Sequence, residues 1–250
     1  MSSVTTPHSE SPIETSADSP RWVPSLSELR QMTSQPDHRV VIQGVNWAFY
    51  EQLVDSTPDR AGIQVDYDGK DVEIMSPSLV HDNDKSLLGR LVETVAEELE
   101  IPLNSAGQTT WKRADVGRGL EADESYFFLS EKLDAVAVGK ARRLLDIADY
   151  PNPDLGIEVD ITPPKIDRLG IYAALKVPEI WRLDGECGQV FIDRLRDDGV
   201  YRSFDRSGFL PIFATEIRRW VLQEDSRDES AWARRLRAWV RAELTSRTEP

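Results

Sequence analysis

Cysteine is almost absent from this sequence: Cys187 is the one cysteine among 250 residues. A chain with a single cysteine forms no intramolecular disulfide, so packing and hydrogen bonding must hold the fold together. This composition is typical of proteins that work in a reducing compartment. Cys187 directly precedes Gly188, and we interpret it as a small residue in a turn rather than a reactive thiol.

Long apolar runs are also missing. No stretch approaches the roughly 18 consecutive apolar residues that a membrane-spanning helix needs. The N-terminal residues are polar and show no apolar segment after a basic start, which a secretory signal would have. We therefore expect a soluble protein of the cytoplasm that has no membrane partner.

The third shortage is positive charge. The chain has 30 basic and 44 acidic residues, which gives a net charge of −14. Proteins that bind nucleic acid usually present a basic face, because releasing counterions from phosphates supplies much of their affinity. Any contact with nucleic acid must therefore be local, or must be assisted by a cation or a partner.

The composition that remains is that of one folded domain with polar ends. Hydrophobic residues make up 40% of the chain, enough for a sizeable core. Residues 1–20 are rich in Ser, Thr, Pro and Glu, and we predict a disordered tail there. We place the folded domain at residues 39–215 and an amphipathic helix within residues 225–250.

Hydropathy periods predict alternating strands and helices. Strands are expected at about 39–45, 63–67, 72–75, 120–129 and 155–161, followed by a three-strand meander over 179–204, whereas helices are expected at about 46–53, 82–99, 165–175 and 229–244. Asp68-Gly69 marks a hairpin turn between two of the strands. We expect a polar connector at 130–150.

The C-terminal helix admits two interpretations. Its apolar stripe contains Trp232, Leu236 and Trp239, whereas several arginines occupy the polar face. The stripe could dock on the domain itself, or the helix could bind phosphate or a partner, for example as the interface of a homodimer.

Two carboxylates share one face of a predicted strand. Because side chains alternate along a strand, Glu158 and Asp160 point to the face opposite Val159. Side-by-side carboxylates repel each other, and a hard cation such as Mg²⁺, which prefers oxygen ligands, would relieve this repulsion. The strand ends at Pro163-Pro164, where a cleft is expected, although a solvated sheet edge would also accommodate the pair.

Two further charged segments could complete such a site. GLEADES, residues 119–125, places Asp123 among other acids after a glycine loop, a pattern that is also common in surface turns. Lys165 and Arg168 open the next predicted helix and could face the carboxylates across the cleft. A surface charge pair is the alternative for these two cations.

Three stretches together resemble the Uma family of bacterial restriction endonucleases, long known as a domain of unknown function. They are VEIMSPSLVHD, GQTTWKRADVGRGLEADESYFF and PNPDLGIEVDITPPKIDRLGIYAALKVPEIWRLDG. The resemblance covers roughly residues 44–215. It implies an α/β fold of the restriction-endonuclease-like PD-(D/E)XK type, with a mixed central sheet flanked by helices.

The resemblance also implies site residues and a cofactor. Asp123 and Glu158 take the positions of the two acids that bind Mg²⁺, or Mn²⁺, and the scissile phosphate of a nucleic acid, with DNA favoured. Asp160 stands where the basic motif has a lysine. Many members carry this lysine on the following helix, a turn before the tyrosine here numbered Tyr172, and this chain has Arg168 there.

This departure leaves two functions open. Arginine stays protonated and clamps phosphate through a planar fork, so Arg168 suits charge stabilisation better than water activation. Lys165, or Lys112 in TTWKR, could substitute for the missing lysine. We therefore expect a metal-dependent endonuclease with Asp123, Glu158, Asp160, Lys165 and Arg168 at its catalytic site. The alternative is a nuclease fold that has lost catalysis and binds nucleic acid or protein.

Overall fold

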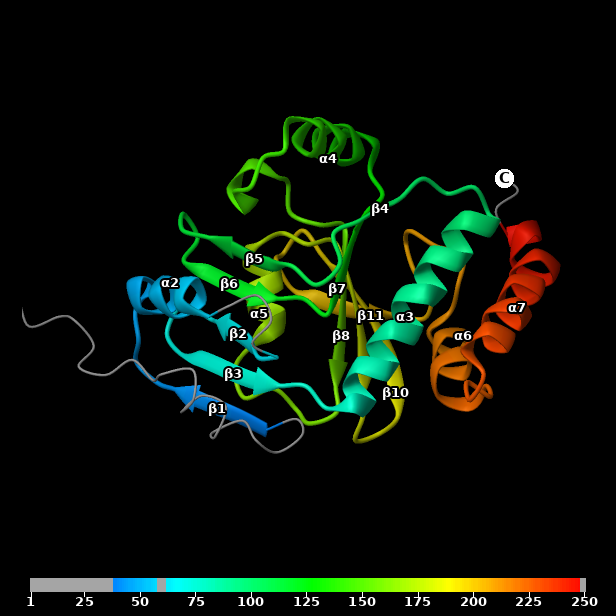
Figure 1. Cartoon of the computed structure of the whole chain (residues 1–250), viewed down its shortest axis with the longest axis horizontal. Coiled ribbons are helices and arrows are strands. Elements are labelled where there is room, and N and C mark those ends of the chain that lie inside the picture. Colours follow the sequence, from blue (N-terminus) through cyan, green and yellow to red (C-terminus); the bar gives the residue numbers. More distant parts are fainter. Residues whose placement is uncertain (1–37, 58–61, 248–250) are drawn as a thin grey trace, which may run out of the picture.

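The computed structural model describes residues 38–57 and 62–247 of the chain. The tail predicted at residues 1–20 lies outside the described residues. The strands form two sheets, one of five strands and one of six. The two sheets lie side by side in Figure 1 and helices flank them, so the predicted α/β class is confirmed.

The five-stranded sheet is antiparallel and has the order β1 (His38–Ile42), β3 (Val72–Ser76), β2 (Gln64–Tyr67), β6 (Arg118–Glu121), β5 (Thr110–Arg113). The predicted hairpin joins β2 to β3 through Asp68-Gly69, where Gly69 has a φ of 92° that favours glycine. Helix α2 (Trp47–Ser56) packs Phe49, Tyr50 and Leu53 into the cluster around this sheet.

The six-stranded sheet is mixed. Its order is β11 (Tyr201–Phe204), β10 (Gln189–Leu195), β9 (Glu179–Asp184), β8 (Leu155–Asp160), β7 (Glu124–Phe127), β4 (Asn104–Ser105). Strands β8 and β9 pair in parallel, and the short helix α5 (Arg168–Ala174) lies between them in the chain. The other neighbours pair antiparallel, and β9–β11 form the predicted meander.

Helix α3 (Leu79–Glu98) covers one face of the six-stranded sheet (Figure 1). Its apolar residues recur at helical spacing and enter one core cluster with the side chains of β8 and β9 that face them, among them Val159 and Trp181. The Ser78 hydroxyl accepts a hydrogen bond from the His81 backbone N–H and caps the helix. The helix therefore begins at Leu79, three residues before the start predicted at Asp82.

The C-terminal helix docks on the domain itself. Helix α7 (Glu229–Trp239) runs on into a π-helical turn, Val240–Leu244, and packs beside α3 (Figure 1). Trp232 is fully buried, and its indole N–H donates to the Trp220 carbonyl. Trp220 lies in the π-helical turn, Arg219–Gln223, that follows helix α6 (Ala214–Arg218). The polar face also engages α3, because Arg237 and Arg241 pair with Glu98.

Two predictions along the middle of the chain are wrong. The strand expected at residues 120–129 is two strands, β6 and β7, which belong to different sheets. The connector expected at 130–150 contains helix α4 (Ser130–Arg142) and a 3-10 turn, Ile147–Asp149. Helix α4 buries only Val136 and Gly139, so its apolar stripe is too weak to reveal it by periodicity.

Candidate active site

The chain crosses from one sheet to the other at Asp123, which lies between β6 and β7. Glu158 and Asp160 lie on β8, the strand paired with β7, and Arg168 is the first residue of α5. All four side chains are buried, with exposed fractions of 0% for Asp123, 2% for Glu158, 8% for Asp160 and 4% for Arg168. The fold therefore brings four of the predicted site residues into one buried cluster.

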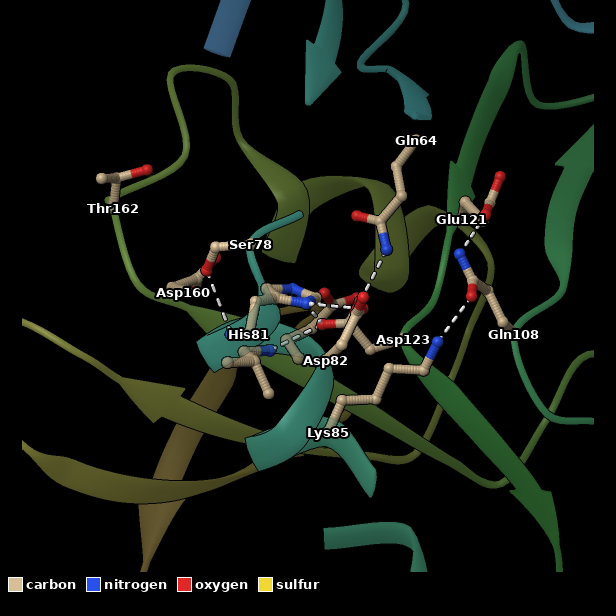
Figure 2. Close-up of polar contacts among 12 residues, drawn as sticks. Gln64, Ser78, His81, Asp82, Lys85, Gln108, Glu121, Asp123, Asp160 and Thr162 are labelled. Carbon is tan, nitrogen blue, oxygen red and sulfur yellow. Dashed lines mark hydrogen bonds and ion pairs between the residues drawn. The ribbon is translucent and has the colours of Figure 1, made fainter. Parts of the chain in front are cut away.

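Asp123 is held on both oxygens. The Gln64 amide donates to its Oδ1 at 2.6 Å (Figure 2). The Val159 backbone N–H donates to its Oδ2 at 2.8 Å. His81 Nε2 lies 3.2 Å from the same Oδ2. Burial alone raises the pKa of Asp123, but the hydrogen bond and charge of His81, together with Arg168, outweigh it and hold the pKa below its ordinary value.

His81 is a further member of this cluster. It lies in the first turn of α3, and its side chain is 1% exposed. The Ser78 cap fixes that first turn, so the imidazole is directed at Asp123 (Figure 2). The sequence feature that could have indicated this role is a histidine directly before an apolar helical stripe.

Glu158 is paired with an arginine and a tyrosine. Arg168 Nη2 lies 2.6 Å from Glu158 Oε2, and the Tyr172 hydroxyl donates to Oε1. Burial raises the pKa of Glu158 well above its ordinary range. The neighbouring charges of Asp123 and Asp160 add to this effect and Arg168 opposes it. Without a nearby cation, burial would therefore favour the neutral form of Glu158.

Arg168 provides such a cation from within the protein. Its Nε lies 3.0 Å from Asp66 Oδ2 on β2, and Nη1 lies 3.7 Å from Asp160 Oδ1. Nη2 also donates to the Glu121 carbonyl at 3.2 Å. Burial alone would lower the pKa of Arg168, but Asp66, Glu158 and Asp160 keep it well above its ordinary value. The guanidinium is therefore charged and fixed between the two sheets.

Asp160 has a second arginine partner in Arg39 of β1. Arg39 Nη2 lies 3.3 Å from Asp160 Oδ1, and Nη1 contacts Glu73 of β3 at 2.5 Å. The Arg39 Nε donates to the Thr162 carbonyl, which fixes the chain after β8. Arg39, Glu73 and Asp66 belong to the other sheet and were not predicted, because nothing local in their sequence marks them.

The two candidate lysines lie elsewhere. Helix α5 begins at Arg168, so Lys165 lies in the preceding loop, where its side chain is exposed and its backbone N–H donates to Glu73. Lys112 Nζ pairs with Asp55 of α2 at 2.9 Å. Within the described residues, neither ammonium contacts Asp123, Glu158 or Asp160.

A pocket of about 160 Å³ opens beside the buried cluster. Its lining includes Glu158, Asp160, Arg168, Tyr172 and Arg182. Glu158 and Asp160 project into it from β8, whereas Arg182 comes from the adjacent strand β9. A ligand in this pocket would meet both acids and two guanidinium groups.

The oxygen atoms of the cluster suit a hard divalent cation in their chemistry. Asp123 and Glu158 offer carboxylate oxygens, and the Gln64 Oε1, buried beside Asp123, has no hydrogen-bond partner among the described residues. The described part of the chain contains no group of three or more His, Cys, Asp or Glu side chains arranged to hold a metal. A cation here would therefore rely on two carboxylates together with amide or carbonyl oxygens.

Most of the folded chain matches the model of a known protein family. Residues 47–209 match the model of the Uma2 family, which is described as "Putative restriction endonuclease". The chain belongs to the Uma2 family. The matched range contains Asp123, Glu158, Asp160 and Arg168, whereas Arg39 lies before it and helix α7 lies after it. The predicted family is confirmed.

Among solved structures, one that is similar is the crystal structure of a nuclease belonging to DUF820 from Anabaena variabilis ATCC 29413, described as putative. The two chains are 18% identical with a TM-score of 0.44, and the match covers 76% of this chain and 99% of the other. No curated protein matches the chain. None of the helices in the described residues is both long enough and apolar enough to cross a membrane.

Proposed function

We propose that this Uma2 protein is a metal-dependent endonuclease that hydrolyses phosphodiester bonds of nucleic acid, with DNA as the preferred substrate. The observation that supports this most is that the structure holds Asp123 and Glu158 close together. Asp123 accepts a hydrogen bond from the backbone N–H of Val159, the residue next to Glu158, so both carboxylates are held at one end of β8, and Glu158 lines an open pocket there. The family description supports the reaction class and the choice of DNA.

In this proposal Asp123 and Glu158 hold Mg²⁺ or Mn²⁺, with Gln64 Oε1 or the Val159 carbonyl as further ligands. The ion would supply a water of lowered pKa and neutralise charge on the phosphate. His81 and Gln64 keep Asp123 ionised and correctly oriented, and Tyr172 orients Glu158. These contacts preorganise the acids, so little rearrangement is needed when substrate binds.

Arg168 has a different task from a catalytic lysine. Its guanidinium is buried and paired with Asp66, Glu158 and Asp160, so it stays protonated and fixed. It can stabilise negative charge that develops on the phosphate, but it cannot accept a proton from water. Lys165 remains a candidate for a mobile cation, since its side chain is exposed in the loop that leads to α5.

A panel of plasmid, linear double-stranded and single-stranded nucleic acids, incubated with Mg²⁺ or Mn²⁺, tests the function. The parent should cleave at least one substrate and Glu158→Ala should cleave none. Glu229→Ala is the control, because it removes an exposed acid that pairs with Arg90 far from the cluster. Equal cleavage by Glu158→Ala and the parent would show that the site is misplaced.

A second function, a binding module without catalysis, is favoured by one observation. Arg168 already compensates the charge of Glu158 and Asp160, and Asp160 occupies the position of the motif lysine. For such a module, the parent would bind nucleic acid or a protein and cleave nothing on the panel. The first result on the panel therefore decides between the two functions.

A further inference from the structure

Arg182 lies directly beside Glu158 on the six-stranded sheet. In the parallel pairing of β8 and β9, Glu158 is the register partner of Arg182. Paired residues on neighbouring strands project to the same face of a sheet. Arg182 therefore faces the pocket that Glu158 and Asp160 enter, and its side chain is one of those lining it.

The guanidinium of Arg182 is positioned from the strand on its other side. Arg182 Nε donates to Asp193 Oδ2 on β10 at 2.8 Å, and its Cζ lies 5.2 Å from the centroid of the Phe191 ring. Asp193 is 3% exposed and accepts a hydrogen bond of 2.5 Å from the Ser203 hydroxyl on β11. The carboxylate is thus itself held in place, and it orients the Nε side of the arginine.

The two Nη groups on the opposite edge of this guanidinium are available to bind a ligand. Neither Nη atom of Arg182 makes a hydrogen bond to another described residue, and 27% of the side chain is exposed. Arg168 and Arg39 differ, because their side chains are 4% and 2% exposed and each binds more than one carboxylate. Arg168 also lines the pocket and its Nη1 makes no hydrogen bond, but its charge is already shared among Asp66, Glu158 and Asp160. Of these two pocket arginines, Arg182 is the more exposed and has both Nη groups without a hydrogen-bond partner in the described residues.

We propose that Arg182 binds a phosphate of the nucleic-acid backbone in this pocket and places it against Glu158. This inference deepens the proposed function and rests on it. A guanidinium with free Nη donors matches the oxygens of a phosphodiester, and its fixed charge needs no proton transfer. Arg182 thereby supplies the substrate-facing cation at a site where the motif lysine is replaced by Asp160. It acts in binding and positioning and leaves activation of water to other groups.

A structural role is the competing explanation, because a cross-strand pair with Asp193 would also stabilise the sheet. Arg194 provides a matched comparison on the same sheet. Its Nε lies 3.1 Å from the buried Glu179, its Cζ lies 4.7 Å from the Phe204 ring centroid, and 30% of its side chain is exposed. Arg194 does not line the pocket. Arg194 Nη2 also donates to the Arg206 carbonyl, so Arg194→Gln removes at least as many structural contacts as Arg182→Gln, whereas only Arg182 faces the pocket.

The test measures binding of a fluorescein-labelled oligonucleotide by anisotropy, with Ca²⁺ present in place of Mg²⁺, over a series of salt concentrations. Removing one charged phosphate contact should weaken binding about 10- to 100-fold and reduce the slope of log affinity against log salt by about one. Arg182→Gln should show both changes, Arg182→Lys should recover part of the slope, and Arg194→Gln should match the parent.

The outcomes separate this inference from the proposed function. If the parent cleaves but Arg182→Gln binds and cleaves as the parent does, the role of Arg182 is wrong and the nuclease function stands. If the parent binds without cleaving and Arg182→Gln loses affinity and salt slope, the role of Arg182 stands without the nuclease. Equal losses in Arg182→Gln and Arg194→Gln, or no binding by the parent, would overturn the inference.

Discussion

Removing the Arg168 guanidinium should destabilise the fold strongly and in a pH-dependent manner. Arg168→Met keeps much of the side-chain volume but leaves carboxylates at 3.0 Å (Asp66) and 2.6 Å (Glu158) without their cation. Breaking a buried ion pair by removing one partner costs about 3–5 kcal/mol. Because Arg39 still faces Asp160, we do not add a further cost for that acid.

Urea unfolding followed by circular dichroism measures this cost. With a slope of about 2 kcal/mol per molar urea, the midpoint of Arg168→Met should fall by about 2 M at pH 7.5. Burial raises the pKa of Glu158 and of Asp160, so these acids become neutral as the pH falls and no longer need the arginine. The difference from the parent should therefore shrink toward pH 5.

A surface arginine provides the control. Arg237 pairs with Glu97 and Glu98, and 43% of its side chain is exposed. Arg237→Met should cost about 1 kcal/mol or less, because exposed ion pairs contribute little. The reasoning would be refuted if Arg168→Met cost no more than Arg237→Met, or if its cost stayed constant as the pH fell.

Two further predictions concern other parts of the fold. The Trp232 ring packs edge-on against Trp220, with 5.8 Å between the ring centroids. Trp232→Ala should lower the unfolding free energy by about 3–5 kcal/mol, because it removes a buried ring and leaves a cavity. Leu145→Ala, at a side chain that is 97% exposed, should change it by less than about 0.5 kcal/mol in the same urea titration, and equal effects would contradict the docking of α7. Burial raises the pKa of Glu124 from 4.5 to about 7, so the stability that this group contributes is present below pH 4.5 and is lost as the pH rises through 7. Glu124→Gln should match the parent at pH 4.5 and be more stable at pH 8, by about 1 kcal/mol once solvent screening of this partly exposed group is allowed for. A constant difference across that pH range would be inconsistent with the shift.

Local sequence patterns predicted the parts of the site that lie close together along the chain. Strand alternation placed Glu158 and Asp160 on one face, and the Pro163-Pro164 break placed Arg168 just beyond the strand. The structure brings these residues together with Asp123. The resemblance to the Uma family was needed to select Asp123, since an acid in a polar turn has no distinctive pattern of its own.

Residues that reach the cluster from the other sheet could not be predicted. Arg39, Asp66 and Glu73 lie on β1, β2 and β3. Their contacts with the cluster join distant parts of the chain; Arg39, for example, pairs with Asp160, which lies 121 residues further along. Such pairing depends on how the two sheets meet. The change of sheet at Asp123 was not predicted either, because the residues on both sides of it favour extended structure.

The dependence of cleavage on Mg²⁺ tests the central claim most directly. The rate of cleavage of a labelled substrate by the parent should rise with Mg²⁺ concentration to a plateau and should fall to background when EDTA is added. Asp123→Asn, which keeps the shape of the side chain that Gln64 and Val159 hold, should show no Mg²⁺-dependent cleavage at any concentration. Cleavage that persists in EDTA, or an Asp123→Asn curve identical to that of the parent, would contradict the account.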